Sequence, residues 1–63
     1  TDWYIPLDQV PASVIATAKR TYPQAEVWAV KMEHYNVYEV KMSNMMELYI
    51  DVNGNLLGQE FDD

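Results

Sequence analysis

Apolar and polar side chains alternate with a period of two between residues 37 and 58. This alternation, in a stretch rich in β-branched and aromatic residues, is typical of antiparallel strands that bury one face of a sheet. Two short breaks, Ser43-Asn44 and Asn53-Gly54, divide the stretch into three predicted strands. The alternation begins earlier, at residue 25, so we predict a sheet over residues 25–61.

A helical period precedes the sheet. Val14, Ala18 and Tyr22 recur at the spacing that places side chains on one face of a helix. Asp8 is a candidate N-cap, which predicts a helix over residues 8–22; a start at Pro11 is the alternative. Residues 1–7 form a leading segment.

The leading segment contains a β-prone triplet, Trp3-Tyr4-Ile5, which is followed by Pro6. Proline lacks a backbone donor and is confined to sheet edges, so the triplet forms at most a short edge segment.

The first hairpin register follows from a loop at residues 34–36, in which Asn36 takes a left-handed conformation. This register predicts four pairs of opposed residues: Met32 with Tyr38, Val30 with Val40, Trp28 with Met42, and Lys31 with Glu39. The last pair joins opposite charges across the strands, which supports the register.

The two later hairpins are predicted in the same way. A loop at residues 43–45 sets Met42 opposite Met46, Val40 opposite Leu48 and Lys41 opposite Glu47. It gives Met45 a position that usually belongs to glycine or asparagine, so a bulge or a longer loop is the alternative. Asn53-Gly54 predicts a type I′ turn, with Ile50 opposite Leu57, Met46 opposite Phe61 and Tyr49 opposite Gly58.

The predicted fold is therefore α+β, with one N-terminal helix packed on a four-stranded antiparallel meander. The predicted core consists of Val14, Ile15, Ala18, Tyr22, Trp28, Val30, Tyr38, Val40, Met42, Met46, Leu48, Ile50, Val52 and Leu57. The other face of the sheet carries charged residues with a few apolar ones among them, including Val27, Ala29 and Leu56, and we expect nothing in the chain to cover it.

The size and charge of the chain argue against some classes of function. The chain has 63 residues, the size of one small domain, and no cysteine. Ten acidic residues against four basic ones give a net charge of −6, which argues against nucleic acid as a partner because phosphate is bound through lysine and arginine. The longest apolar run is too short to span a bilayer, so we expect no membrane insertion.

No residue pattern indicates catalysis or a cofactor. His34 is the sole histidine and lies in a predicted loop, where a solvated side chain is expected. The segment 51–55 superficially resembles a calcium loop, but its glycine is fourth where an EF-hand requires it sixth. We expect a protein that is not an enzyme and binds no cofactor or metal.

The open sheet face is the candidate contact surface. Tyrosine combines a large rigid ring with a hydroxyl and is enriched at interface hot spots, and acidic neighbours favour a basic partner. The predicted partner-binding residues are Tyr35, Val37, Glu39, Glu47 and Tyr49. The occupant would be a protein partner or a second copy of the chain.

Several short segments resemble one family in their order along the chain. They are Val10-Pro11-Ala-Ser-Val14, Ala18-Lys19, Tyr22-Pro23-Gln-Ala25-Glu-Val27, Tyr38-Glu39-Val40, Glu47-Leu-Tyr-Ile-Asp51 and Asn53-Gly54-Asn-Leu-Leu57. In this order, over residues 5–60, the chain resembles the PepSY-like domains, also described as β-lactamase-inhibitor-like. Val10 stands where the family usually has leucine, and the chain holds one unit where many members carry two.

The resemblance implies one helix on an antiparallel sheet in an extracytoplasmic bacterial domain, periplasmic or secreted. It implies protein binding, including restraint of a peptidase or another enzyme, and it supplies no catalytic residues. A structural unit that self-associates through its open sheet face is the alternative function.

Overall fold

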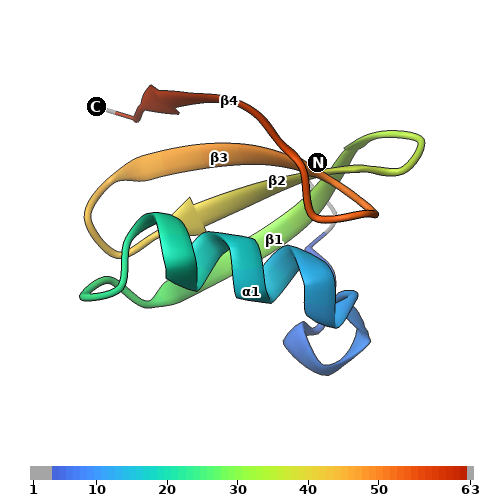
Figure 1. Ribbon diagram of the computed structural model, residues 1–63, viewed down its shortest axis with the longest axis horizontal. Coiled ribbons are helices and arrows are strands. Elements are labelled where there is room, and N and C mark those ends of the chain that lie inside the picture. Colours follow the sequence, from blue (N-terminus) through green and yellow to red (C-terminus); the bar gives the residue numbers. More distant parts are fainter. Residues whose placement is uncertain (1–3, 63) are drawn as a thin grey trace.

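The computed structural model describes residues 4–62 of the chain. Its elements are a short 3₁₀ helix η1 (Leu7–Gln9), the helix α1 (Ala12–Thr21) and the strands β1 (Val27–His34), β2 (Val37–Met42), β3 (Met46–Asp51) and β4 (Leu56–Phe61) (Figure 1). The strands form one antiparallel sheet in the order β1-β2-β3-β4. The predicted α+β fold, a helix followed by a four-stranded meander, is confirmed.

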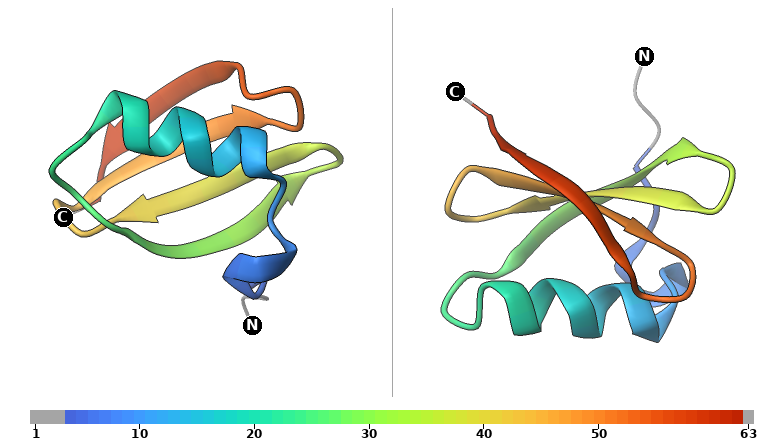
Figure 2. Two further views of the ribbon diagram at one scale, coloured as in Figure 1. Left: turned by 60° about the horizontal axis from the view of Figure 1, so that its bottom comes forward. Right: turned by 45° about the horizontal axis from the view of Figure 1, so that its top comes forward.

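Helix α1 lies along one face of the sheet, and no other described helix or strand covers the opposite face (Figure 2). We call these the inner and outer faces. The buried apolar core between α1 and the sheet consists of Val10, Val14, Ala18, Ala25, Val30, Tyr38, Val40, Met42, Leu48 and Ile50. Most of these residues are predicted by the periodicity; Val10 and Ala25 are not.

The helix starts later than the first of the two predicted positions. It begins at Ala12 with Pro11 as its N-cap residue, whereas Asp8 lies within η1. Val10 is extended, with ψ 135°, and separates the two helices. A residue that precedes proline is driven out of the helical region by the pyrrolidine ring, so the break falls at Val10 and the alternative start is the right one.

Predicted residue pairs are found in all three strand pairings. The pairs Val30–Val40, Lys31–Glu39, Met32–Tyr38, Val40–Leu48, Lys41–Glu47, Met46–Phe61 and Tyr49–Gly58 are all present. Asn36 and Met45 have the positive φ values that their loops require, 62° and 74°. Met45 also donates its backbone N–H to the carbonyl of Met42 over 3.1 Å, as expected of a tight loop.

Trp28 is not in the core, contrary to the prediction. Val27 pairs with Met42 and Ala29 pairs with Lys41, so Trp28 is the extra residue of a bulge. A bulge breaks the alternation of faces and re-aims the side chain that it carries. The indole is 72% exposed as a result.

The last hairpin is also corrected. Ile50 pairs with Leu56, and the register shift leaves Leu57 57% exposed. The connection is not a type I′ turn, which needs positive φ at both Asn53 and Gly54, because only Gly54 has one, at 88°. Asp51 shapes the loop instead, since its Oδ1 accepts the backbone N–H groups of Asn53 and Asn55, each over 2.9 Å.

The leading segment pairs with the outer edge of β1. Ile5 donates its backbone N–H to the Val30 carbonyl over 2.7 Å, and Tyr4 forms a bridge with Lys31. The predicted edge segment is therefore present at these two residues, and Trp3 lies outside the described residues.

Candidate protein-binding face

The centre of the outer face is a group of charged side chains that cover one another. We call Lys31, Glu39, Lys41, Glu47 and Asp62 the ionic cluster. The Lys41 ammonium lies 3.0 Å from Glu47 Oε2, 3.5 Å from Asp62 Oδ2 and 3.6 Å from Glu39 Oε2. Lys31 reaches Glu39 Oε1 over 3.9 Å.

Much of the ionic cluster is withdrawn from water, although no helix or strand among the described residues lies over it. Glu39 is 5% and Glu47 is 9% exposed. Lys31 lies opposite Glu39 and Lys41 lies opposite Glu47, so the ammonium group of each lysine reaches a carboxylate on the neighbouring strand. A partly buried charge is tolerated when it is paired, so the cluster holds these side chains in one arrangement.

Lys41 shows the effect of this pairing on ionisation. Its hydrogen bond to Glu47 raises the pKa of the ammonium well above its ordinary value, against an opposing contribution from burial, and the charges of Glu47, Asp62 and Glu39 add to the rise. Lys41 therefore remains a cation at every physiological pH.

Tyr49 stands beside the ionic cluster on β3, opposite Glu39 on one side and Gly58 on the other. Its hydroxyl donates to Glu60 Oε2 over 2.5 Å. This hydrogen bond, together with burial and the nearby carboxylates, raises the pKa of the phenol. The absence of a side chain at Gly58 leaves one flank of the ring uncovered by β4.

The structure brings together three of the five residues that we predicted for binding. Glu39, Glu47 and Tyr49 are neighbours on the outer face. Val37 is half-buried opposite Asp51, farther along β2, and Tyr35 lies in the β1–β2 turn with 88% of its surface exposed. The two glutamates are already engaged by lysines, so Tyr49 and Tyr35 offer more accessible surface than Glu39 and Glu47.

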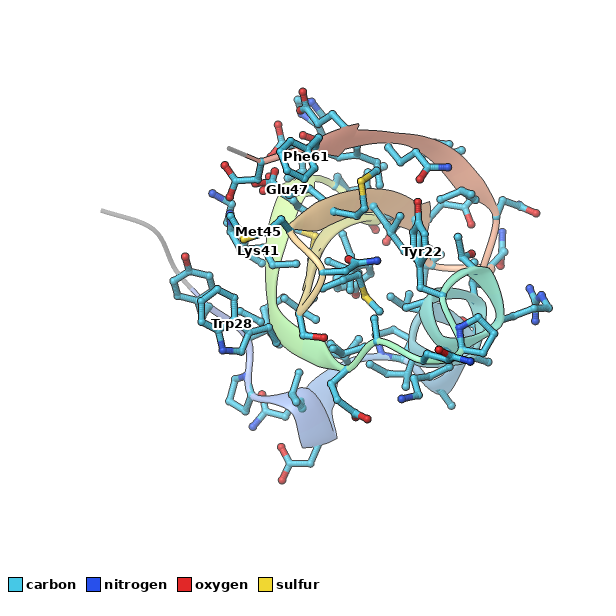
Figure 3. The ribbon with its side chains drawn as sticks, turned by 90° about the vertical axis from the view of Figure 1, so that its left-hand side faces the viewer. Tyr22, Trp28, Lys41, Met45, Glu47 and Phe61 are labelled. Atoms are coloured by element: carbon cyan, nitrogen blue, oxygen red, sulfur yellow. The ribbon has the colours of Figure 1, made fainter. Side chains whose placement is uncertain are left out.

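A second group of exposed side chains lies where β1 and β3 begin and β2 and β4 end. We call Trp28, Met45, Phe61 and Asp62 the turn-end patch. Trp28, Met45 and Asp62 line a small hollow of about 40 Å³ together with Lys41 and Glu47. Figure 3 shows Trp28, Lys41, Met45, Glu47 and Phe61 on one side of the molecule and Tyr22 on the other.

Sequence reasoning missed the turn-end patch because its main residue was assigned to the core. The alternation of residues 27–32 fits either face for Trp28, since a single bulge reverses the assignment. Residue size is the one signal in the sequence: Trp28 and Met42 are both large, and the predicted register sets them directly opposite each other.

A larger open pocket of about 420 Å³ lies at the same end of the sheet. It is lined by Tyr22, Pro23, Gln24, Ala25, Ser43 and Asn44. The lining holds no carboxylate, amine or imidazole, and its polar side chains are the phenol of Tyr22, the hydroxyl of Ser43 and the amides of Gln24 and Asn44.

Two kinds of feature are not found in the part of the chain that the structure describes. Residues 4–62 contain no grouping of three histidine, cysteine, aspartate or glutamate side chains that could hold a metal ion. Within the same residues, no helix combines the length and the apolar character needed to cross a membrane.

Comparison with known proteins gives one match. The profile of the family described as "Putative beta-lactamase-inhibitor-like, PepSY-like" matches residues 1–58. No curated protein and no solved structure shows significant similarity to the chain.

Proposed function

The chain belongs to the PepSY-like family, and from this premise we propose that it is a non-enzymatic protein-binding module of the bacterial cell envelope, periplasmic or secreted. The family description names inhibitors, which favours a protein as the partner and restraint of an enzyme as the outcome of binding. The same description is compatible with a chain that carries out no catalysis itself.

The observation that carries this proposal is the open outer face. Tyr49 lies there beside an ionic cluster whose members fix one another, so the face is ordered before a partner arrives. A preordered surface loses less side-chain entropy on binding than a mobile one. This favours a binding role for the face over a purely solvated one.

The proposed contact residues differ in their roles. Tyr49 and Val37 supply apolar area on the outer face, and Tyr35 extends the contact to the β1–β2 turn. Glu39 and Glu47 give the face its acidic character while they position Lys41 and Lys31. Such a surface favours a partner with a basic patch, mostly through the rate of association and specificity.

The test is capture of envelope proteins followed by titration of the captured partner. Tyr49→Lys places a cation among the carboxylates of the binding face, and Ala16→Lys places the same charge on an exposed position of α1, on the opposite side of the sheet. We expect Tyr49→Lys to weaken binding by roughly 5–30-fold, the loss typical of an anchor residue, and Ala16→Lys to bind as the unmodified chain does.

Thermal melting of both variants must first establish that they fold. Equal binding by the folded Tyr49→Lys variant and the unmodified chain would contradict the assignment of the outer face. A chain that captures no envelope protein would contradict the binding role itself.

Self-association is the second candidate function, and the exposed apolar residues of β4, the strand at one edge of the sheet, favour it. Leu56, Leu57 and Phe61 are 40%, 57% and 61% exposed. If two copies associate, the melting temperature rises with protein concentration by mass action. A melting temperature that does not change with concentration, and a monomeric mass in sedimentation, would rule out this candidate.

A further inference from the structure

We propose that the turn-end patch binds an arginine or lysine side chain that a protein partner presents. The inference rests on the proposed protein-binding function, and it adds a chemical class of side chain and a place where that side chain is held. The place differs from the Tyr49-centred region of the outer face.

The aromatic part of the turn-end patch is available to a ligand. Trp28 is 72%, Phe61 is 61% and Met45 is 46% exposed. The bulge in β1 turns the indole away from the core, toward the hollow that it shares with Met45 and Asp62. Tryptophan is the aromatic side chain that attracts a cation most strongly over its ring face.

The charges around the patch select a cation over an anion. Four carboxylates, those of Glu39, Glu47, Glu60 and Asp62, stand against the ammonium groups of Lys31 and Lys41 on this part of the outer face. Lys41 is surrounded by three of these carboxylates, which offset its repulsion of an incoming cation.

Asp62 is the carboxylate best placed to meet the incoming side chain. Its side chain is 53% exposed, against 11% for Glu47 and 7% for Glu39. It lines the same hollow as Trp28. A guanidinium or ammonium group between the two would meet a ring face and a carboxylate together, the pairing that charge-assisted contacts favour.

Charge complementarity also decides between occupants. A second copy of the chain carries the same net charge of −6 and would bring like charges to a surface that already has an excess of carboxylates. A basic segment of another protein is attracted by the same surface.

The probe is a tetra-arginine peptide with blocked ends, and its neutral match is the same peptide with citrulline in place of arginine. Citrulline keeps the shape and length of arginine and removes the charge. Titrations into the ¹⁵N-labelled chain follow the indole N–H of Trp28 and the backbone amides of Met45 and Asp62. Trp3→Phe leaves Trp28 as the only tryptophan, so indole fluorescence gives a second readout.

We expect the arginine peptide to shift these signals, the citrulline peptide to leave them in place, and added salt to weaken the interaction. Asp62→Asn should raise the dissociation constant by about two- to fivefold, and Asp8→Asn, in the exposed helix η1, should not. Trp28→Ala, followed through the backbone amides, should raise the dissociation constant of the arginine peptide by about two- to fivefold. Leu7→Ala should leave this constant unchanged.

Two results would overturn the inference: equal shifts with the arginine and citrulline peptides, or binding that Trp28→Ala and Asp62→Asn leave unchanged. Shifts that grow with protein concentration in the absence of peptide would assign the patch to a second copy and would overturn it as well. Its failure is distinguishable from failure of the proposed function, because envelope capture that depends on Tyr49 would persist if the patch bound no cation.

Discussion

The Thr17 hydroxyl donates to the Gly54 carbonyl over 2.5 Å and so joins helix α1 to the loop between β3 and β4. One turn earlier in the helix, the Ser13 hydroxyl donates to the Val52 carbonyl over 2.6 Å. The two bonds satisfy loop carbonyls that no strand partner reaches, and they bring the helix backbone against Gly54. A Cβ atom at Gly54 would lie closer to Ser13 and Thr17 than ordinary van der Waals contact.

Gly54→Ala should lower the free energy of unfolding by at least about 1–2 kcal/mol, since the residue has a left-handed φ of 88° that disfavours a Cβ atom. The new Cβ would also lie 3.1 Å from the Ser13 carbonyl oxygen and 3.2 Å from the Thr17 hydroxyl oxygen. Gly58→Ala is the matched control, because nothing lies within 4 Å of its Cβ position, and it should change stability by about 0.5 kcal/mol or less. Urea unfolding of both variants measures the difference, and equal losses would contradict the close packing at Gly54.

Leu48→Ala should cost about 2–5 kcal/mol of unfolding free energy, because the side chain is fully buried beneath α1 and its removal leaves a cavity. Leu57→Ala removes the same atoms from a side chain that is 57% exposed, and should cost about 0.5 kcal/mol. Chemical denaturation of the pair tests the position of the second bulge. If Leu57→Ala were as costly as Leu48→Ala, Leu57 would belong to the core.

Lys41→Met should destabilise the fold by about 1–3 kcal/mol, since it removes the ammonium that three carboxylates share and leaves the largely buried Glu47 without that partner. Lys19→Met is the control. Its ammonium pairs with Glu26 over 3.3 Å, but the two side chains are 41% and 81% exposed, so its loss should cost about 1 kcal/mol at most. Melting temperatures that fall equally in the two variants would show that burial adds nothing to the ionic cluster.

The free energy of unfolding should decline at alkaline pH. Folding raises the pKa of Lys41 through its hydrogen bond to Glu47, and the pKa of Tyr49 through its hydrogen bond to Glu60. Both groups therefore hold their protons to higher pH in the folded chain than in the unfolded one. Their contribution is complete below the unfolded values of about 10 and is lost as the pH rises toward the folded ones.

Melting temperatures recorded at increasing pH check this expectation. Tyr49→Phe removes one of the two titrations and should make the alkaline decline shallower. Asp51→Asn should make the decline in melting temperature at acid pH shallower. Hydrogen bonds from Asn55 lower the pKa of the Asp51 carboxyl, so the contribution of this group to stability is lost as the pH falls. An alkaline decline that is unchanged by Tyr49→Phe would show that ionisation of Tyr49 does not contribute to the loss of stability at high pH.

The sequence predicts the centre of each hairpin better than its ends. Lys31–Glu39 and Lys41–Glu47 are identifiable because opposite charges face each other only in one register. Trp28 and Leu57 were placed wrongly because both are bulge residues. A bulge adds one residue to one strand. The alternation of apolar and polar residues continues on both sides of it, so this alternation does not predict where the bulge lies.

The arrangement of the proposed binding face is predictable to a similar extent. Glu39, Glu47 and Tyr49 were placed together correctly from parity alone. The burial of Glu39 and Glu47 does not follow from parity, because no described helix or strand covers them and their neighbours are the lysines with which they pair. The turn-end patch depends on the bulge at Trp28, so it could not be predicted from a sequence that does not reveal the position of that bulge.

The pairing of the leading segment with β1 has a consequence for how far the sheet could grow. Ile5 occupies part of the β1 edge, whereas β4 has no strand beyond it among the described residues. Two copies that met through their β4 edges would leave two outer edges, each partly occupied by Tyr4 and Ile5. A third copy would then find fewer free backbone groups to pair with, which would disfavour open-ended fibre growth.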